Sequence, residues 1–510
     1  MEISLFKIAL TFGLLFFLRL IYRYFVKSYL VLQSIKKIKG AVCVYNPLFG
    51  VYPQYEKDYY NKNDYYYTTK KLLKENKGAK FLATPFMDQI TIELYDPEMV
   101  KEFIAQQKSF VKDLRIFGVV TPAVKNGLSF TEGEKWKYQK KLLSQIFHFE
   151  YMNSCIPLIN QVVDGWITRY CKEPKSTVDV TNAFKMYAGE IVFNIFFGED
   201  SFYRTPDAQK AVIVALKMMN DMLMLATDPK NFLFGPKFVN WRLGKREREY
   251  LSDNKFLNDF VSKQLQTLKK KYISEKEQGK TQQKSWKTLI ECLLEEAPKS
   301  GLSEKEFEGD MLSHLLVFFL AGIDAPSNNL IMIQYFLSIH PEIQQKLRDE
   351  INEAIPLGQK VTRDHIMNLK YLNAVFKEVL RHSTDALFPR RAMEDVMIGD
   401  LKVKKDFSVI ASIVGLNNNP NSFSDPEVFN PDRWLEKVEE GTNNTYAFIP
   451  FSIGQRRCIA EQLAIIESKA MTIELVRRFK MTLKQPYQLK MVQGLSYQPT
   501  ETMEIIFEKL

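Results

Sequence analysis

At 510 residues, the chain is long enough for several domains or for one large enzyme fold with a deep interior. Its 46% hydrophobic and 25% charged residues are typical of a folded globular protein, which excludes a disordered or fibrous chain. The net charge of +10 suits an anionic membrane surface, nucleic acid or an acidic protein partner, and charge alone does not choose among them.

The first 27 residues predict a membrane anchor. Their longest uncharged apolar run, Ile8 to Leu18, is short for a membrane span. Lys7 and Arg19 flank this run, and their long side chains can reach opposite interfaces, which lengthens the apolar helix. No small-residue cleavage site follows, so we expect residues 1–27 to be retained and not removed as a signal peptide. An amphipathic helix lying on the membrane surface is the alternative.

A basic linker, residues 28–40, follows the anchor. Between Arg19 and Lys39 the chain has six basic residues and no acidic residue. Positive charge beside a membrane span is typical of its cytosolic side. We therefore expect a single-pass anchor with the rest of the protein facing the cytosol.

Residues 41–510 are predicted to form a single, mainly α-helical domain with a small β portion. Alternating strand patterns are clearest near Lys80 to Tyr95 and Asp400 to Ser412, whereas helical periods dominate from Glu134 to Lys480. The most polar segment, Leu268 to Lys287, predicts a solvent-exposed loop between helices. Glu306 to Ile339 is apolar all round, which predicts a long helix through the core.

Cys458 is the cysteine whose setting suits metal binding. The five cysteines form no CxxC pair, so neither a disulfide framework nor a zinc site is expected. Gly454 permits a tight turn before Cys458, and a helix from Ile459 to Arg478 is predicted directly after it. We expect the helix dipole, with Arg456 and Arg457, to lower the pKa of the thiol. A redox-sensing thiol or a nucleophile needs a similar electrostatic field. A nucleophile also needs a histidine base, and none of the five histidines lies in a recognisable catalytic setting. An axial ligand of haem is the better match.

The stretch Phe451-x-x-Gly454-x-Arg456-x-Cys458-x-Ala460 resembles the haem-binding loop of the cytochrome P450 family, in which alanine is tolerated at the last position. Further motifs of the family lie upstream in the expected order, and the resemblance covers nearly all of residues 41–510. It implies the mainly α cytochrome P450 fold, with heme b between the long central helix and the helix that follows the cysteine loop. Phe451, Gly454 and Arg456 would form the cofactor-binding loop, and Cys458 would be the axial thiolate ligand.

A second motif resembles the family's structural triad. Glu378 and Arg381 are three residues apart, which places them on one helix face. Arg433, in the segment Phe429 to Trp434, matches the arginine that completes the triad in the family. A Glu and an Arg three residues apart most often form an exposed ion pair on a helix. Here Arg433 and the cysteine loop downstream favour a buried network instead.

Two segments resemble the family's propionate-binding motifs. Trp136 and Lys140 correspond to the WxxxR helix, with lysine in place of arginine, so the fork-like recognition by arginine is lost. In the segment from Pro389 to Asp395, Arg391 is the predicted second propionate ligand, and Arg390 is the alternative.

The central helix departs from the family at its oxygen-activating segment, which contains Asp324, Ala325, Pro326 and Ser327. Asp324 keeps the acid of the proton relay, but Ala325 replaces the threonine whose hydroxyl assists proton delivery. Pro326 removes a backbone donor and is expected to widen a helix kink. Water held in the kink, Ser327 or a hydroxyl of the substrate could complete the relay.

By resemblance, the protein is a monooxygenase that inserts one oxygen atom of O₂ into a lipophilic substrate such as a fatty acid, sterol or terpenoid. Electrons would come from NADPH through NADPH-cytochrome P450 reductase, with cytochrome b5 as a further candidate partner. The implied location is the endoplasmic reticulum membrane, with membrane lipid and no nucleic acid among the partners. Two alternatives stay open: a peroxide-rearranging or dehydrating haem-thiolate enzyme independent of O₂ and reductase, and a non-catalytic haem sensor or carrier.

Substrate contacts are expected by position from five places in the chain. They are Arg115 to Phe130, Met218 to Leu225, Phe319 with Ala325, Ala386 to Phe388, and Leu495 to Tyr497. The methionines of the second segment are more often core packing than a substrate lining, so none is assigned individually.

Overall fold

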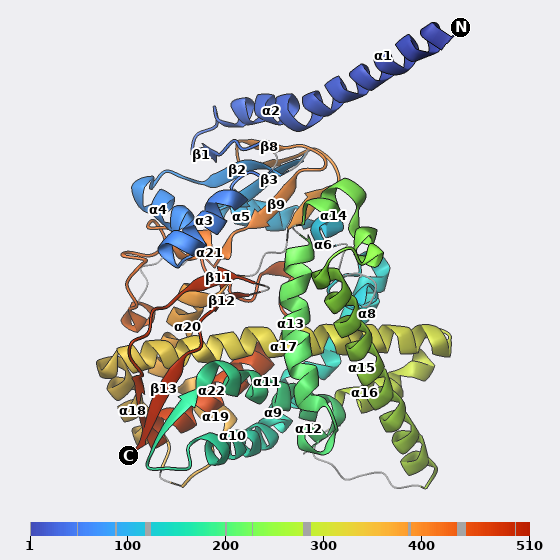
Figure 1. Ribbon diagram of the computed structural model, residues 1–510. Coiled ribbons are helices and arrows are strands. Elements are labelled where there is room, and N and C mark those ends of the chain that lie inside the picture. The colour runs from blue at the N-terminus through green and yellow to red at the C-terminus, as the bar shows by residue number, and fades with distance from the viewer. Residues whose placement is uncertain are drawn as a thin grey trace. The chain divides into compact units, whose positions relative to one another are not determined.

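The structure is a computed structural model that describes residues 2–47, 49–86, 89–117, 124–198, 201–226, 228–278, 287–356, 358–385, 389–435, 445–494 and 496–510 (Figure 1). The chain divides into two compact units. Unit 1 comprises Met1–Asp113, Asp385–Val428 and Val438–Gly454, and unit 2 comprises Leu114–Thr384, Phe429–Lys437 and Gln455–Leu510. The predicted fold class, mainly helical with a small β portion, is confirmed.

Unit 1 is built on a six-stranded sheet in the order β1 (Ala41–Cys43), β2 (Phe81–Phe86), β3 (Gln89–Leu94), β9 (Ser408–Ala411), β6 (Arg390–Ala392) and β4 (Phe110–Lys112). β2 and β3 form an antiparallel hairpin, whereas β3 and β9 pair in parallel, so both predicted strand regions lie side by side in one sheet. β7 (Val396–Ile398) and β8 (Leu401–Val403) form a separate hairpin. Apolar side chains from these strands and from the nearby helices make the core of this unit.

The helices of unit 1 include the N-terminal segment. They are α1 (Glu2–Ile21), continued by a π-helical turn over Tyr22–Val26, α2 (Lys27–Ile35), α3 (Tyr52–Lys62), α4 (Tyr67–Glu75), α5 (Pro97–Ala105), the short 3₁₀ turn Gln107–Ser109 and α21 (Ile413–Asn417). On α1, Leu10, Phe12 and Leu14 to Leu18 are all exposed, which distributes apolar surface around the whole helix. A helix that is apolar on every face has no face suited to water.

Unit 2 contains most of the helices. They are α6 (Leu114–Phe117), α8 (Gly133–Ile146), α9 (Phe149–Ser154), α10 (Ile156–Tyr170), α11 (Val180–Phe197), α12 (Ser201–Arg204), α13 (Ala208–Ala226), α14 (Pro229–Phe234), α15 (Lys245–Glu277), α16 (Leu289–Glu296), α17 (Glu304–Ile339), α18 (Pro341–Ala354), α19 (Arg363–Asn368), α20 (Lys370–Ser383) and α22 (Glu461–Arg478), with 3₁₀ turns at Pro236–Trp241, Ala297–Lys299 and Pro431–Trp434. A three-stranded antiparallel sheet has the order β10 (Phe479–Leu483), β13 (Glu504–Lys509) and β5 (Lys175–Asp179), and β11 (Met491–Gln493) pairs with β12 (Tyr497–Pro499) as a hairpin.

The predicted long central helix is α17. It begins with a capping box in which Ser303 and Glu306 satisfy each other's exposed backbone N–H groups. It packs against α11, α20 and α22, as Figure 1 shows. By length and composition it is also the one helix that could cross a membrane among the residues searched, but 78% of its most apolar window is buried inside the protein, which identifies it as a core helix.

The predicted loop from Leu268 to Lys287 is wrong in its first half, because α15 continues to Glu277. Its alternating charges stabilise the helix instead of exposing a loop: Lys271 lies 3.7 Å from Glu275 one turn later. Lys269 also forms an ion pair, at 2.6 Å, with Glu304 at the start of α17. Residues 279–286 lie outside the described part of the chain.

Glu93 on β3 is a buried carboxyl group whose hydrogen-bond partners are hydroxyls. Its Oε2 accepts hydrogen bonds from Tyr55 Oη at 3.3 Å and Tyr95 Oη at 3.2 Å, and Tyr55 Oη lies 2.9 Å from Thr69 Oγ1. Burial raises the pKa of Glu93 to about 7, against these hydrogen bonds, and the charge of Asp385 raises it further. The folded state therefore favours the neutral acid.

We expect Glu93→Gln to flatten the pH dependence of stability. Because the pKa of Glu93 is about 7 when folded and near 4.5 when unfolded, its contribution to stability is complete below 4.5 and is lost as pH rises through 7. At about 1.4 kcal/mol per pKa unit, the wild type loses roughly 3 kcal/mol over this interval and the variant does not. Urea unfolding at a series of pH values measures the difference. The exposed Glu56→Gln is the matched control, and identical slopes for all three proteins would contradict the assignment.

Candidate functional site

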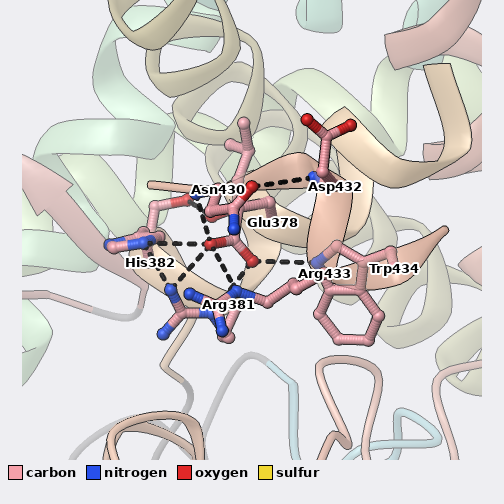
Figure 2. A network of polar contacts seen from close by, with 9 residues as sticks. Glu378, Arg381, His382, Asn430, Asp432, Arg433 and Trp434 are labelled. Carbon is pink, nitrogen blue, oxygen red and sulfur yellow. Dashed lines mark hydrogen bonds and ion pairs between the residues drawn. The ribbon is translucent and has the colours of Figure 1, made fainter. Parts of the chain in front are cut away.

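A buried ion network joins α20 to the segment Phe429 to Trp434 (Figure 2). Glu378 and Arg381 lie three residues apart on α20, and the side chains of both are completely buried. Arg381 Nε donates to Glu378 Oε2 at 3.0 Å, and Nη2 donates to Oε1 at 2.8 Å. This two-pronged pair has the fork geometry that makes arginine suitable for a buried carboxylate.

The second segment completes the coordination of the Glu378 carboxylate. Arg433 Nε lies 3.1 Å from Oε1, and the main-chain N–H of Asn430 donates to the same oxygen at 2.9 Å. Trp434 Nε1 donates to Oε2 at 2.8 Å. The proximity of the three predicted residues, Glu378, Arg381 and Arg433, is thus present in the structure. Asn430 and Trp434 are additional partners that spacing alone did not single out.

His382 extends this network toward an aromatic stack. Its Nε2 lies 2.6 Å from Arg381 Nη2, and its ring packs at centroid distances of 5.4 Å from Phe336 and 5.7 Å from Phe429. Burial by itself raises the pKa of Glu378, but the contacts with His382 and Arg381 outweigh burial and hold that pKa well below its usual range. The carboxylate is therefore charged, and the segment it binds is fixed to the helix.

The glycine turn before Cys458 is required by the backbone. Gly454 has φ +76°, a conformation that side chains with a Cβ rarely adopt. A Cβ at this position would lie 3.2 Å from Ile104 and 3.3 Å from Gln107, so space is short as well. Phe451, near the start of the loop, is half-buried. A 3₁₀ turn then spans Gly454–Arg456.

Cys458 is exposed as a residue, although the atoms packed around its sulfur desolvate the thiol, and α22 begins three residues later. The predicted lowering of its pKa is wrong, because desolvation raises the pKa to about 11 against the opposing hydrogen bond of the Ala460 N–H. Arg457 does lower this pKa, as expected, but desolvation outweighs its charge, and Glu461, to which Arg457 Nε and Nη2 donate at 2.5 and 2.6 Å, acts in the opposite direction. A metal ion bound here has to displace a proton from the thiol.

Trp136 and Lys140 on α8 form a cationic cluster with Arg456 of the Gly454–Arg456 turn. The guanidinium of Arg456 lies 3.8 Å from the centroid of the Trp136 ring, and Lys140 Nζ lies 5.3 Å from it. Arg456 also binds Glu132 and donates to the main-chain carbonyl of Thr131, and Lys140 donates to the main-chain carbonyl of Gln455. Burial, and then the charge of Arg456, lower the pKa of Lys140. Two cationic side chains beside the Trp136 indole fit an anionic group such as a haem propionate.

Arg391 lies on β6 of unit 1. Its Nη1 forms a 3.3 Å ion pair with Asp406 Oδ1. Because successive side chains of a strand point to opposite faces, Arg390 lies on the other face, together with the buried Ala392. The assignment of a propionate to Arg391, with Arg390 as the alternative, stays a prediction.

On α17, small side chains interrupt the buried surface. Ala321 and Ala325 are exposed, whereas Ile323, Asp324 and Pro326 between and beside them are buried. Residues four apart lie on one helix face, so the two alanines form an open strip on a core helix. An exposed cysteine and such a strip fit a flat cofactor. Among the described residues no group of three His, Cys, Asp or Glu could hold a metal ion by itself.

Asp324 and Ser327 make separate contacts. Asp324 is buried, and Ser496 Oγ donates to its Oδ2 at 2.7 Å while Asn328 Nδ2 donates to Oδ1 at 3.2 Å. Ser327, fully buried, donates its hydroxyl at 3.0 Å to the main-chain carbonyl of Asp324 and not to the carboxylate. Ser496 is a partner that the sequence did not indicate, because it lies 172 residues away.

The predicted substrate-contact segments fall partly outside the described residues, namely at 118–123, 386–388 and 495. On α13, Met218, Met219 and Met222 are buried and belong to the core, as their composition suggested, whereas Met224 is exposed.

Comparison with known proteins matches residues 44–507 to the family model described as "Cytochrome P450". Cytochrome P450 734A1 of Arabidopsis thaliana is 25% identical over 451 residues, covering 85% of this chain and 81% of that protein. Cytochrome P450 3A18 of Rattus norvegicus is 26% identical over 401 residues, covering 76% of this chain and 77% of that protein. In fold, the chain is similar to the crystal structure of the cytochrome P450DA heme domain, with a TM-score of 0.74, 19% identity and coverage of 93% and 99% of the two chains.

We expect Glu378→Ala to destabilise unit 2 by about 3–5 kcal/mol, because it leaves buried arginines without their counter-ion. Trp434→Phe keeps an aromatic ring at this position, where Lys377 Nζ lies 5.4 Å from the centroid of the Trp434 ring. It removes the indole N–H and thus one hydrogen bond to a charged group, which costs about 1.5–3 kcal/mol. Urea unfolding measures both variants. The exposed Glu353→Ala is the control. If Trp434→Phe unfolds at the same midpoint urea concentration as the wild type, the hydrogen bond of the Trp434 indole contributes nothing to the free energy of unfolding.

Proposed function

Because the chain belongs to the cytochrome P450 family, we propose that it is a membrane-bound haem-thiolate monooxygenase that receives electrons from NADPH through a reductase. The family assignment establishes a cytochrome P450 monooxygenase with heme b and cysteine thiolate ligation. Redox partners and lipophilic substrates are general for the family. The observation that carries the residue assignment is the exposed position of Cys458 behind the Gly454 turn.

Cys458 is the proposed axial ligand, and the residues around it would hold the macrocycle. Trp136, Lys140 and Arg456 would bind one propionate, which is supported by the two cationic side chains that lie beside the Trp136 ring. Arg391 is the proposed ligand of the second propionate. Phe451 and Gly454 would shape the loop against the ring. When bound, haem supplies the activation of O₂ and the transfer of one oxygen atom.

The surrounding residues have two further proposed tasks. The charged network of Glu378, Arg381 and Arg433 would fix the loop segment that precedes Cys458, so that the thiolate keeps one position. On α17, Asp324 would hold a proton close to the site, and Ala325 would leave room where the family has threonine. Ser327 is less suited to this relay, because its hydroxyl is bound to its own helix.

The anchor is proposed to comprise residues 1–27, followed by the basic linker 28–40 and one catalytic domain, 41–510. The exposed apolar side chains around α1 support insertion into lipid, and the basic charges after it support a cytosolic catalytic domain. We place the protein in the endoplasmic reticulum membrane, which would also give a lipophilic substrate a route to the enzyme.

The proposed electron donors are NADPH-cytochrome P450 reductase and cytochrome b5. Lys137 and Lys141 on α8 are exposed on the helix that carries Trp136, and this charge suits an acidic partner. Lys137 has a local partner in Glu134, at 2.6 Å, so part of its charge is already balanced.

Reduction of the purified protein under carbon monoxide tests the cofactor assignment. We expect a red-shifted Soret band for the wild type and for Cys43→Ala, and no such band for Cys458→Ala, because only Cys458 supplies the thiolate. A band that survives in Cys458→Ala would contradict the assignment. Product formed without NADPH, reductase and O₂ would instead support a peroxide-rearranging enzyme, and absence of any turnover would support a haem carrier.

Removal of residues 1–27 tests the anchor. The full chain should remain in the membrane pellet after alkaline carbonate extraction, because an inserted helix is held by hydrophobic burial and not by charge. The shortened chain should be extracted. Extraction of the full chain together with the shortened one would show that α1 lies on the surface and does not span.

A further inference from the structure

The acid of the central helix lacks the neighbouring hydroxyl that its family motif normally supplies, since residue 325 is alanine. A buried carboxylate can exchange protons with its surroundings only through a group that both donates and accepts hydrogen bonds, such as a hydroxyl or a water molecule. The hydroxyls around Asp324 therefore decide how a proton reaches it.

Two serine hydroxyls lie close to Asp324, and their geometry separates them. Ser327 Oγ donates to the main-chain carbonyl of Asp324 at 3.0 Å and is fully buried. Ser496 Oγ donates directly to the carboxylate oxygen Oδ2 at 2.7 Å. Ser327 is thus committed to the helix backbone, whereas Ser496 is in contact with the titrating atom.

Ser496 also occupies the boundary between the buried acid and accessible space. Its side chain is half-buried, whereas Asp324 is buried. It lies in the turn between β11 and β12, where its carbonyl accepts a 2.9 Å hydrogen bond from the Gly494 N–H. Ser496 is thus the more exposed of the two groups that share this hydrogen bond.

Asn328 holds the two groups together. Its Nδ2 lies 3.2 Å from Asp324 Oδ1, 2.8 Å from Ser496 Oγ and 3.0 Å from Gln498 Oε1. Because Asn328 Nδ2 donates a hydrogen bond to Ser496 Oγ, the hydrogen of the serine hydroxyl can point at the carboxylate. The amide thereby orients the Ser496 hydroxyl as a donor to Asp324.

We propose that Ser496 is the relay residue through which solvent protons reach Asp324. The inference rests on the proposed function, in which Asp324 holds the proton for the reaction. A proton arriving from water binds Ser496 Oγ, the O–H bond that points at Asp324 breaks, and that hydrogen ends on Oδ2. Serine is neutral before and after the transfer, and the carboxylate becomes a carboxylic acid.

The electrostatic surroundings favour loading of the acid. Burial raises the pKa of Asp324, while the hydrogen bond from Ser496, the charge of Lys185 and the amide of Asn328 oppose this rise. The protonated form is therefore more populated than in an exposed aspartate, and a relay that delivers the proton has a stable acceptor.

Infrared spectroscopy of the resting full-length holoenzyme in D₂O tests the relay without substrate. Protonated Asp324 gives a carbonyl stretching band, identified by its loss in Asp324→Asn, and the band shifts when deuterium replaces hydrogen. In Ser496→Ala we expect this exchange to slow by about tenfold or more, because the positioned proton carrier is lost. In Ser496→Thr, which keeps a hydroxyl, exchange should return toward the wild-type rate.

A control on the same hairpin separates the relay from a structural effect. Thr500 is exposed, and its hydroxyl donates to the Lys490 carbonyl at 3.3 Å, so Thr500→Ala removes a hydroxyl without touching Asp324. Its exchange rate should equal that of the wild type. Unchanged exchange in Ser496→Ala, slow exchange in Ser496→Thr as well as in Ser496→Ala, or absence of an Asp324 band from acidic to neutral pH would each overturn the proposal.

The carbon monoxide difference spectrum of the same preparations separates this inference from the proposed function. A normal thiolate band with unchanged exchange in Ser496→Ala rejects only the relay. Absence of the thiolate band in the wild type rejects the haem-thiolate assignment. It also rejects the reaction for which Asp324 would hold a proton.

Discussion

The buried carboxylate of Glu378 joins two distant segments of unit 2 beside the candidate site. It accepts hydrogen bonds from Arg381 on its own helix and from Arg433, Asn430 and Trp434 on a distant segment. A charge buried in this way is tolerated only if its lone pairs are satisfied, so the two segments cannot separate without exposing unpaired ions to a low-dielectric interior. The ion network and the aromatic stack of Phe336, Phe429 and His382 thus join the two segments at the same point.

The sequence was sufficient for features that follow from local pattern. The apolar run from Glu306 to Ile339 predicts α17, and the glycine before Cys458 predicts the tight turn that Gly454 forms. The spacing of Glu378 and Arg381 fixes them on one helix face, and the family motif supplied Arg433 as the third member. These features depend on residues close in sequence or on a motif of known order.

Features that depend on contacts between distant segments could not be predicted. Asp324 and Ser496 meet only because the β11–β12 hairpin lies against α17, and no periodicity indicates that contact. The neighbours of Cys458 in sequence predict a low pKa for its thiol, and Arg457 does act in that direction, but desolvation in the folded chain dominates. The composition of the charged end of α15 predicts a loop, because composition does not reveal ion pairs with another helix.

The hydrogen bond between Asp324 and Ser496 has a consequence for how such a chain can change through evolution. Ser496 lies in a turn expected to contact substrate, and the same turn touches the acid of the central helix. Mutations that reshape this turn for a new substrate would also displace a partner of the acid. Selection on this turn would therefore also act on the partners of the acid, and divergent members of the lineage should show paired replacements at positions 324, 328 and 496 instead of independent ones.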